Sequence, residues 1–380
     1  MRWTCGFRAL LWMVLGLTLS ACRYRAPESI PVGALFPLSG KMADQGEYAR
    51  NGALMAVAEV NADGGVGGKA LRLVDADSQS TGESGLPAYQ TLLHAEHVVA
   101  TVTMLDDVVG PASKLAGRLQ HVLLSGSAPD VFVAKEGDTV FSFDPDSVFE
   151  ARAAAAYAAQ TLHITTAATL AVERHTSVAA AAAFADEFRR LGGRIVSQHI
   201  VKWNFDAVAY GEDVAKPMRQ LGVSVPPLVF VSGPAKTTAL ALRTGQQMGW
   251  RTQWITGSSF ELDGGIAAAG AAADGVIYTA LRPLTGDTPR AQAFIEAYRR
   301  RFGLPPQWIA ASTYDAIHAL ASAMTATGAR SGPELARALR SRTLEGVLGR
   351  IDFSTKAFLE RPLEFRTVST GRVKVLVERP

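Results

Sequence analysis

The chain has 380 residues, of which 48% are hydrophobic, and its 38 Lys and Arg residues and 35 Asp and Glu residues leave a formal net charge of +3. A balance this close to neutral lacks the positive surface that nucleic-acid binding requires, so we exclude a nucleic-acid partner. Without its leader the chain still has the length of two domains.

The first residues have the pattern of a bacterial lipoprotein leader. Arg2 and Arg8 precede an apolar run over residues 9–19. This run is too short to cross a bilayer, because a spanning helix needs ~20 apolar residues, but it suits a signal peptide. The run ends in the letters LSAC at 19–22, which resemble a lipobox, the motif whose cysteine is lipidated and becomes the first mature residue.

We therefore expect residues 1–21 to be a lipoprotein signal peptide, Cys22 to be lipidated and residues 22–28 to form a tether. An ordinary signal peptide that ends near a cysteine is the alternative, although it would leave a lone reactive thiol in an oxidising compartment. Cys5 leaves with the leader. The fold must then be stabilised by packing and not by disulfides.

The glycine-rich letters NADGGVGGKAL at 61–71 suggest comparison with a phosphate-binding loop. That motif needs Ser or Thr after its Gly-Lys pair, whereas here alanine follows, and an aspartate fills the first glycine position. A helical pattern over 47–61 ends just before the glycines. We interpret Gly64 and Gly65 as a helix stop and tight turn, and predict no cofactor.

Short apolar runs alternate with helical patterns along the rest of the chain. The segments predicted as buried strands are 32–36, 98–104, 122–125, 168–172, 227–231 and 275–279. The alanine-rich stretches at 150–162 and 178–188 are predicted to be helices that pack closely on a sheet. This alternation predicts an α/β fold with parallel sheets flanked by helices.

Two stretches resemble the periplasmic branched-chain amino-acid (Leu/Ile/Val) binding proteins, which are type I solute-binding components of ABC transporters. The first, at 30–81, contains the loop letters PLSG at 37–40, Gly46 and the glycine turn; the second contains the letters YDA at 314–316. The resemblance extends over residues 31–352.

The resemblance implies two Rossmann-like lobes that are joined by three chain crossings, with a ligand cleft between them. The first lobe would comprise 29–146 plus 282–350, and the second 147–281 plus 351–380. Ligand would favour the closed form, because only there does it contact both lobes.

The same resemblance places the ligand-binding residues in loops at the cleft. Where the family has carboxylate-binding serines, this chain has Leu105, Asp106 and Asp107. The family's Tyr and Glu, which bind the ligand's ammonium group, correspond to Pro234 and Ser258. The implied ligand-binding residues are Ser39, Gln45, Leu105, Asp106, Asp107, Ser125, Ser127, Ala128, His175, Pro234 and Ser258.

These differences predict that the ligand is not a free branched-chain amino acid. Serine donates a hydrogen to a carboxylate, whereas ionised Asp106 or Asp107 only accepts and would repel it. At ~4 Å and an effective dielectric of ~20, two like charges cost on the order of 4 kcal/mol. A cationic, amide or hydroxyl-rich solute would suit them. Alternatively, the aspartates cap the following helix and do not contact ligand.

Enzyme-like patterns are weak. His94 and His97 lie one helical turn apart without further metal ligands nearby in the sequence, and Asp75 and Asp77 are read as solvated carboxylates at a sheet end. The letters SGSAP at 125–129 lack the second glycine of a nucleophile elbow. We predict no catalytic or metal site.

The predicted function is that of a monomeric, lipid-anchored solute-binding protein at the extracytoplasmic face of the bacterial envelope. It would capture a small polar molecule and deliver it to an ABC permease. The alternative is a sensor or envelope-regulating protein that uses the same fold without transport.

Overall fold

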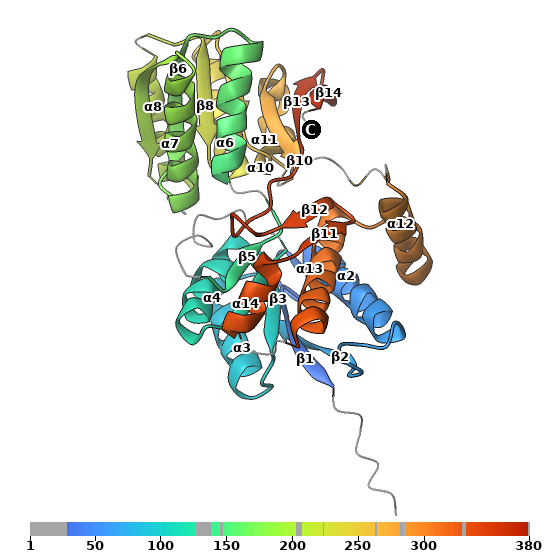
Figure 1. Ribbon diagram of the computed structural model, residues 1–380. Helices are drawn as coiled ribbons and strands as arrows, with labels where there is room; N and C mark the ends of the chain where they lie inside the picture. Colours follow the sequence, from blue (N-terminus) through green and yellow to red (C-terminus); the bar gives the residue numbers. More distant parts are fainter. Residues whose placement is uncertain are drawn as a thin grey trace, which may run out of the picture.

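The computed structural model describes residues 29–126, 138–144, 147–202, 207–222, 224–262, 264–281, 284, 286, 288–328 and 332–378. The predicted signal peptide, tether and Cys22 lie outside these residues, as do Ser127 and Ala128. The chain forms two lobes, each built around its own sheet (Figure 1).

The first lobe contains a five-stranded sheet in which every pair of neighbours is parallel. The strand order is β2-β1-β3-β4-β5. The strands are β1 (Ile30–Phe36), β2 (Leu71–Asp77), β3 (Ala100–Thr103), β4 (Val122–Ser125) and β5 (Val140–Ser142). β3, β4 and β5 are buried along their whole length, as expected of parallel strands covered on both faces.

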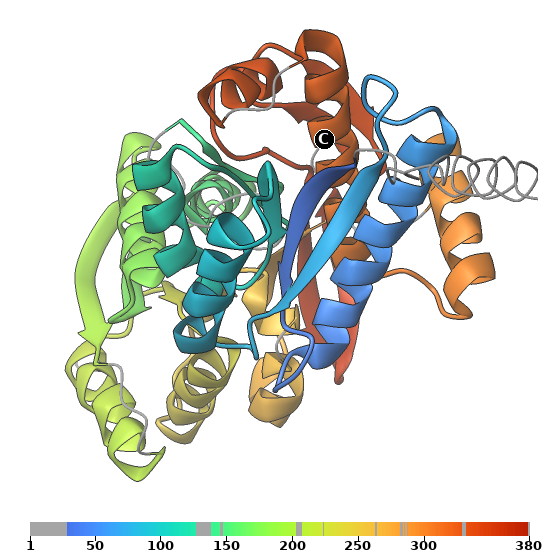
Figure 2. The ribbon, with the colours of Figure 1, turned by 90° about the horizontal axis from the view of Figure 1, so that it is seen from below.

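Helices cover both faces of this sheet (Figure 2). One face packs against α3 (Gly82–His94) and α4 (Asp106–Leu119). The other packs against α2 (Ala43–Ala62) and α13 (Trp308–Thr327), with α12 (Pro289–Phe302) and α14 (Gly332–Arg340) beside them.

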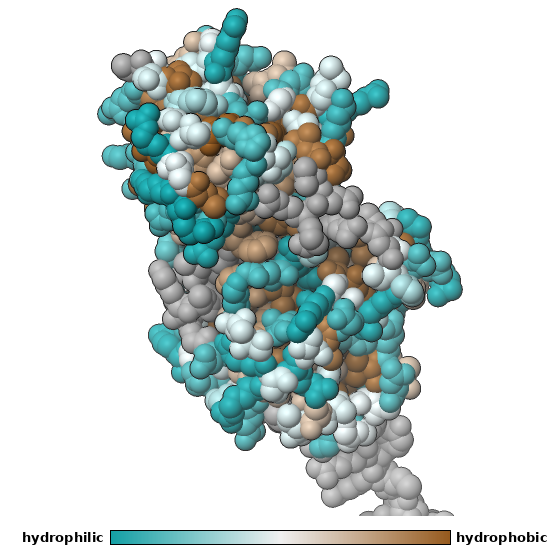
Figure 3. Space-filling view, turned by 45° about the horizontal axis from the view of Figure 1, so that its top comes forward, coloured by the Kyte–Doolittle hydropathy of each residue, from teal (hydrophilic) through white to brown (hydrophobic). Residues whose placement is uncertain are grey.

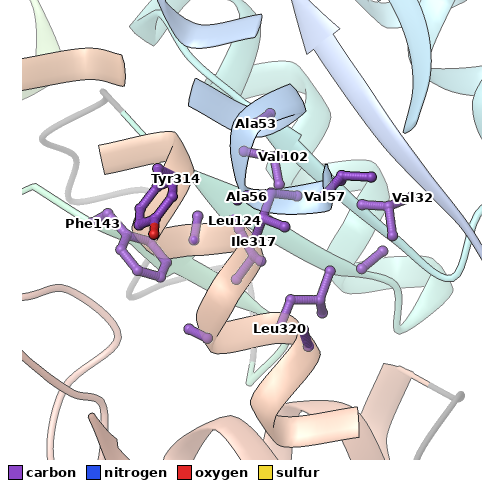
Figure 4. Packing of buried hydrophobic residues seen from close by; sticks show 14 of the residues in the cluster. Val32, Ala53, Ala56, Val57, Val102, Leu124, Phe143, Tyr314, Ile317 and Leu320 are labelled. Carbon is purple, nitrogen blue, oxygen red and sulfur yellow. The ribbon is translucent and has the colours of Figure 1, made fainter. Parts of the chain in front are cut away.

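Small residues let α2 and α13 approach each other closely over the sheet. A Cβ atom at Gly52 would lie 2.0 Å from the Ala310 carbonyl oxygen, so only glycine fits there. Around this contact, Val32 and Val102 from the sheet meet Ile317 from α13 in one buried cluster (Figure 4). Residues near 50 and near 310 therefore build a single core.

The second lobe contains a seven-stranded sheet of order β14-β13-β10-β9-β8-β6-β7. Its strands are β6 (Thr166–Val172), β7 (Arg194–Val201), β8 (Leu228–Ser232), β9 (Gln253–Thr256), β10 (Ile277–Leu281), β13 (Leu363–Ser369) and β14 (Arg372–Glu378). β13 is antiparallel to both β10 and β14, and the other neighbours are parallel.

The helices of the second lobe include the alanine-rich segments predicted from the sequence. They are α6 (Ser147–Ala156), which continues into a π-helical turn (Tyr157–Thr161), α7 (His175–Arg190), α8 (Ala207–Leu221), α9 (Ala235–Gln247), α10 (Ser259–Leu262), α11 (Gly265–Ala269) and a 3-10 turn (Gly270–Ala273). Ala154 and Ala183 are buried in one cluster with Phe230 of the sheet, so their small side chains allow the predicted close packing.

The chain passes between the lobes three times, after β5, after β10 and before β13 (Figure 1). Ahead of the third crossing, β11 (Thr343–Gly346) and β12 (Gly349–Asp352) form a small antiparallel pair. The predicted fold class is confirmed. The lobe boundaries stay predictions, and we propose that the last crossing follows Leu359, because this residue and Phe353 are buried with the first lobe's core.

The glycine-rich segment is a turn, as predicted. α2 ends at Ala62, and Gly64 and Gly65 follow with φ of +96° and +71°. The Gly65 amide donates to the Val60 carbonyl at 2.8 Å, which closes the helix end. The glycines therefore connect a helix to β2.

On the face of the molecule that Figure 3 shows, hydrophilic residues are spread over both lobes, with apolar residues in smaller areas among them. Within the described residues, no helix is both long and apolar enough to cross a membrane.

Candidate ligand-binding site

A cavity of about 170 Å³ lies at the carboxyl ends of the parallel strands of the second sheet. This is where open α/β sheets place their ligands, because the loops that follow the strands meet there. Its lining residues are Asp106, Ser147, Glu150, Ala151, Arg174, Thr176, Ser177, Ala180, Phe230, Ser232, Gly233, Pro234, Thr256, Gly257, Ser258, Ser259 and Thr279. Hydroxyl groups predominate, and Asp106 comes from the first lobe.

Glu150 is held rigidly in this wall. It lies in the first turn of α6, and its residue is 6% exposed. Its Oε1 accepts from the Ser258 hydroxyl at 2.7 Å, and its Oε2 accepts from the Ser258 amide at 2.8 Å and the Thr279 hydroxyl at 2.6 Å. A carboxylate, which can only accept, is thereby matched by three donors.

The start of α4 brings the first lobe's acidic residues to the cleft. Leu105 precedes the helix with φ of 72°, a conformation that favours glycine, and its side chain packs into the first lobe's core. The N-cap residue itself is Leu105, whose side chain makes no capping hydrogen bond. Asp106 and Asp107 instead occupy the first turn, where their charge suits the helix dipole.

Asp107 forms an ion pair with the opposite lobe. The Arg174 Nη2 atom donates to its Oδ1 at 3.1 Å, and Arg174 directly precedes α7. Both residues also line a larger depression of about 520 Å³ at the edge of the cleft, together with His175 and Lys114. The pair links the first turn of α4 to the start of α7.

A buried charge cluster lies beside the crossings. We call Asp144, Asp315 and Arg361 the hinge triad. Burial raises the pKa of the Asp144 carboxyl well above its usual range, Arg361 opposes the rise, and the charges of Glu150 and Asp106 add to it. Burial also raises the pKa of Asp315, against the opposing effect of Arg361.

Backbone groups complete the hinge triad. Asp315 accepts the amides of Val347 and Leu348 at 2.7 and 3.1 Å, which fixes the turn between β11 and β12. Arg361 donates from Nε to the Phe143 carbonyl and from Nη1 to the Leu348 carbonyl, both at 2.8 Å. The charge of Arg361 therefore acts on Asp144 beside the first crossing, and the charges of Glu150 and Asp106 at the cavity act on the same carboxyl group.

The structure distributes the predicted ligand-binding residues over several places. Asp106, Pro234 and Ser258 line the cavity, and Asp107 and His175 line the depression beside it.

The other predicted residues have different surroundings. The Ser39 hydroxyl donates to Asp77 at 2.6 Å, and the Gln45 amide donates to Gln307 at 2.9 Å. Ser125 is fully buried in β4. Neither these three residues nor Leu105 lines the cavity or the depression beside it.

Residues that raised chemical alternatives have structural roles in the described part of the chain. Asp75 pairs with Arg50 at 2.6 Å, and Asp77 accepts amides of the loop after β1. His94 and His97 are exposed, and no group of three or more potential metal ligands occurs among the described residues.

Sequence reasoning missed the residues that shape the cavity most, Glu150 and Arg174. The resemblance places the family's glutamate at Ser258, and in this structure the carboxylate beside Ser258 comes from a residue 108 positions away. One signal was present in the sequence, since Glu150 is the acidic residue in the first turn of an alanine-rich helix.

Comparison with known proteins gives consistent matches. Residues 29–372 match the model of a family described as periplasmic binding protein. The Leu/Ile/Val-binding protein homolog 2 of Brucella abortus (strain 2308) is 24% identical over 335 residues, which cover 86% of each chain. A leucine-, isoleucine-, valine-, threonine- and alanine-binding protein of Pseudomonas aeruginosa is 22% identical over 340 residues, covering 88% of each.

Solved structures share the fold. A leucine-binding protein from Thermotoga maritima has a TM-score of 0.76 at 20% identity, covering 92% of this chain and 98% of that one. A solute-binding protein of an ABC transporter from R. palustris, solved with benzoate, has a TM-score of 0.69 at 19% identity, covering 92% and 96%. The ligands named for such structures therefore differ in chemistry.

Proposed function

This chain belongs to the periplasmic binding protein family, and on that premise we propose that it captures a small polar solute by cleft closure and delivers it to an ABC permease. Membership implies an extracytoplasmic location and a binding role. The observation that carries the proposal is the cavity at the strand ends of the second lobe, to which Asp106 of the first lobe contributes. A solute held there would contact both lobes only in the closed form.

The ligand we propose is amino-acid-like, an amide or another polar solute, but not a free branched-chain amino acid. The cavity wall offers many hydroxyls and two carboxylates, Asp106 and Glu150. Hydrogen-bond acceptors of this kind suit a solute rich in donors, whereas a ligand carboxylate would be repelled.

We expect the purified protein to release a small polar molecule on denaturation, identifiable by mass spectrometry. Calorimetric titration should then show no micromolar binding of leucine, isoleucine or valine, because Asp106 lines the cavity and would repel a ligand carboxylate there. Tight binding of any of the three would refute the ligand class. Unchanged uptake of all solutes in a deletion strain, combined with altered envelope growth, would favour the sensor alternative.

We also propose that Cys22 carries the membrane anchor. Serine would remove the lipid-bearing thiol, and stable membrane attachment needs more than one acyl chain. The replacement should therefore move the protein from the membrane to the soluble fraction on cell fractionation. Cys5→Ser is the matched control and should leave the protein on the membrane. A wild-type protein found entirely in the soluble fraction would contradict the anchor.

A further inference from the structure

Two carboxylates from opposite lobes line the same cavity. Asp106 begins α4 of the first lobe, and Glu150 lies in α6 of the second. The serine and threonine donors that hold Glu150 fix its two oxygens at the wall. The carboxylate is thus positioned before any ligand arrives, which lowers the entropic cost of binding.

The basic side chain that lines this cavity is already bonded to an acid. This side chain is Arg174, which lines the cavity together with Asp106 and Glu150. Its guanidinium donates to Asp107 at 3.1 Å. Among the residues that line the cavity, two carboxylates thus accompany one guanidinium group, and that group is paired with Asp107.

A buried carboxyl group, Asp144, responds to these two carboxylates, whose charges contribute to raising its pKa. Asp144 is only 4% exposed, and its Oδ1 has no hydrogen-bond partner in the part of the chain that the structure describes. It lies close enough to interact electrostatically with both Glu150 and Asp106. Its basic neighbour, Arg361, is shared with Asp315. The negative charge of the cavity wall therefore extends its effect to Asp144 beside the first crossing.

We infer that the ligand carries a cationic group, an ammonium or a guanidinium, that lies between Asp106 and Glu150 and draws the two lobes together. This inference rests on the proposed function and specifies its substrate class. Like charges on opposite lobes oppose closure, and a cation between them replaces one repulsion with two attractions. The remaining N–H groups of the cation would donate to hydroxyls such as those of Ser232 and Thr256.

The test compares ligand charge at nearly constant shape. The mature wild-type chain is titrated by calorimetry with the cations choline, agmatine and putrescine, with 3,3-dimethylbutan-1-ol as the neutral isostere of choline, and with leucine and benzoate. We expect at least one cation to bind, with the neutral and carboxylate-bearing probes at least roughly tenfold weaker. A benzoate preference would instead point to Arg174 as an anion site.

Variants then locate the cation. Asp106→Asn and Glu150→Gln should each weaken binding of the cationic probe roughly 10- to 100-fold, the range expected for a lost hydrogen bond to a charged group, and leave the neutral isostere unchanged. Asp186→Asn is the control, because its side chain is 80% exposed and pairs with Arg189 near the far end of α7. Urea midpoints verify that each variant folds.

The outcomes separate the two levels of the proposal. Preferred binding of leucine or benzoate, or a cation affinity that neither variant changes, overturns the cationic ligand and leaves a solute-binding protein. If none of the six probes binds and the purified protein releases no solute on denaturation, the proposed function itself fails, and the inference fails with it.

Discussion

Replacing Arg361 by methionine should lower the free energy of unfolding by about 3–5 kcal/mol, the loss expected when one partner of a buried charge network is removed. Arg361 is 6% exposed, and it is the guanidinium that faces both Asp144 and Asp315. Methionine retains most of the volume of the side chain but neither its charge nor its donors. The carbonyls of Phe143 and Leu348 would also lose their hydrogen bonds.

The measurement is the urea midpoint at pH 7.5, with Arg350→Met as the matched control. Arg350 is 65% exposed and pairs with Asp352 at 2.7 Å, so its replacement should cost less than ~1 kcal/mol. An Arg361→Met variant as stable as the Arg350→Met variant would show that the hinge triad does not stabilise the fold.

The same substitution should cost less at acidic pH. Without the guanidinium, the pKa values of Asp144 and Asp315, already raised by burial, would rise further. A carboxyl whose pKa is higher in the folded than in the unfolded state favours folding at low pH, and that contribution is lost as pH rises through the folded pKa. The difference between wild type and Arg361→Met should therefore shrink between pH 7.5 and pH 5. A pH-independent difference would contradict this explanation.

Six strands, β1, β3, β4, β6, β8 and β10, could be predicted from the sequence, because parallel strands covered on two faces are continuous apolar runs. β9 and β13 are also interior strands and were not predicted. β4 was predicted with its exact bounds, and β8 is shifted by one residue. β7 was missed because it lies at the edge of its sheet and its burial alternates along the strand, with Ile200 56% exposed. β11 and β12 are only four residues each and pair with each other, so neither is a long apolar run.

The site was partly predictable from the family resemblance. It placed Pro234 and Ser258 in the cleft, and both line the cavity, two residues after the ends of β8 and β9, where ligands of parallel sheets bind. Glu150 lies on a helix after the first crossing, and only tertiary packing brings it to Ser258. The pairing of Asp107 with Arg174 likewise depends on how the two lobes meet, which no local pattern encodes.

A second large effect is expected from His121, which lies just before β4. Burial lowers the pKa of its imidazole to about 4. The ring contacts the side chain of Thr101, with 3.1 Å between its Nε2 and the threonine Oγ1, and it lies edge-on to Tyr89 at 5.9 Å between centroids. Neither neighbour carries a negative charge that would stabilise a protonated ring. Protonation of this histidine is therefore opposed in the folded state.

The consequence is a loss of stability in acid. In the unfolded chain the imidazole titrates near its usual pKa of ~6.5. Below that pH the unfolded state binds a proton that the folded state does not bind. The stabilisation is complete above ~6.5 and is lost as pH falls to about 4, the folded pKa. Each pKa unit corresponds to ~1.4 kcal/mol, so the full interval amounts to on the order of 3 kcal/mol.

Urea midpoints of wild type, His121→Asn and His94→Gln between pH 4.5 and 7.5 test this expectation. The difference between wild type and His121→Asn isolates the imidazole, because the titrations of all other groups cancel in it. This difference should favour wild type at pH 7.5, by the packing and the Thr101 contact, and should shrink or reverse towards pH 4.5. His94 is exposed, so its replacement should leave the pH profile unchanged. A constant difference between wild type and His121→Asn across the range would mean that the imidazole titrates alike in both states.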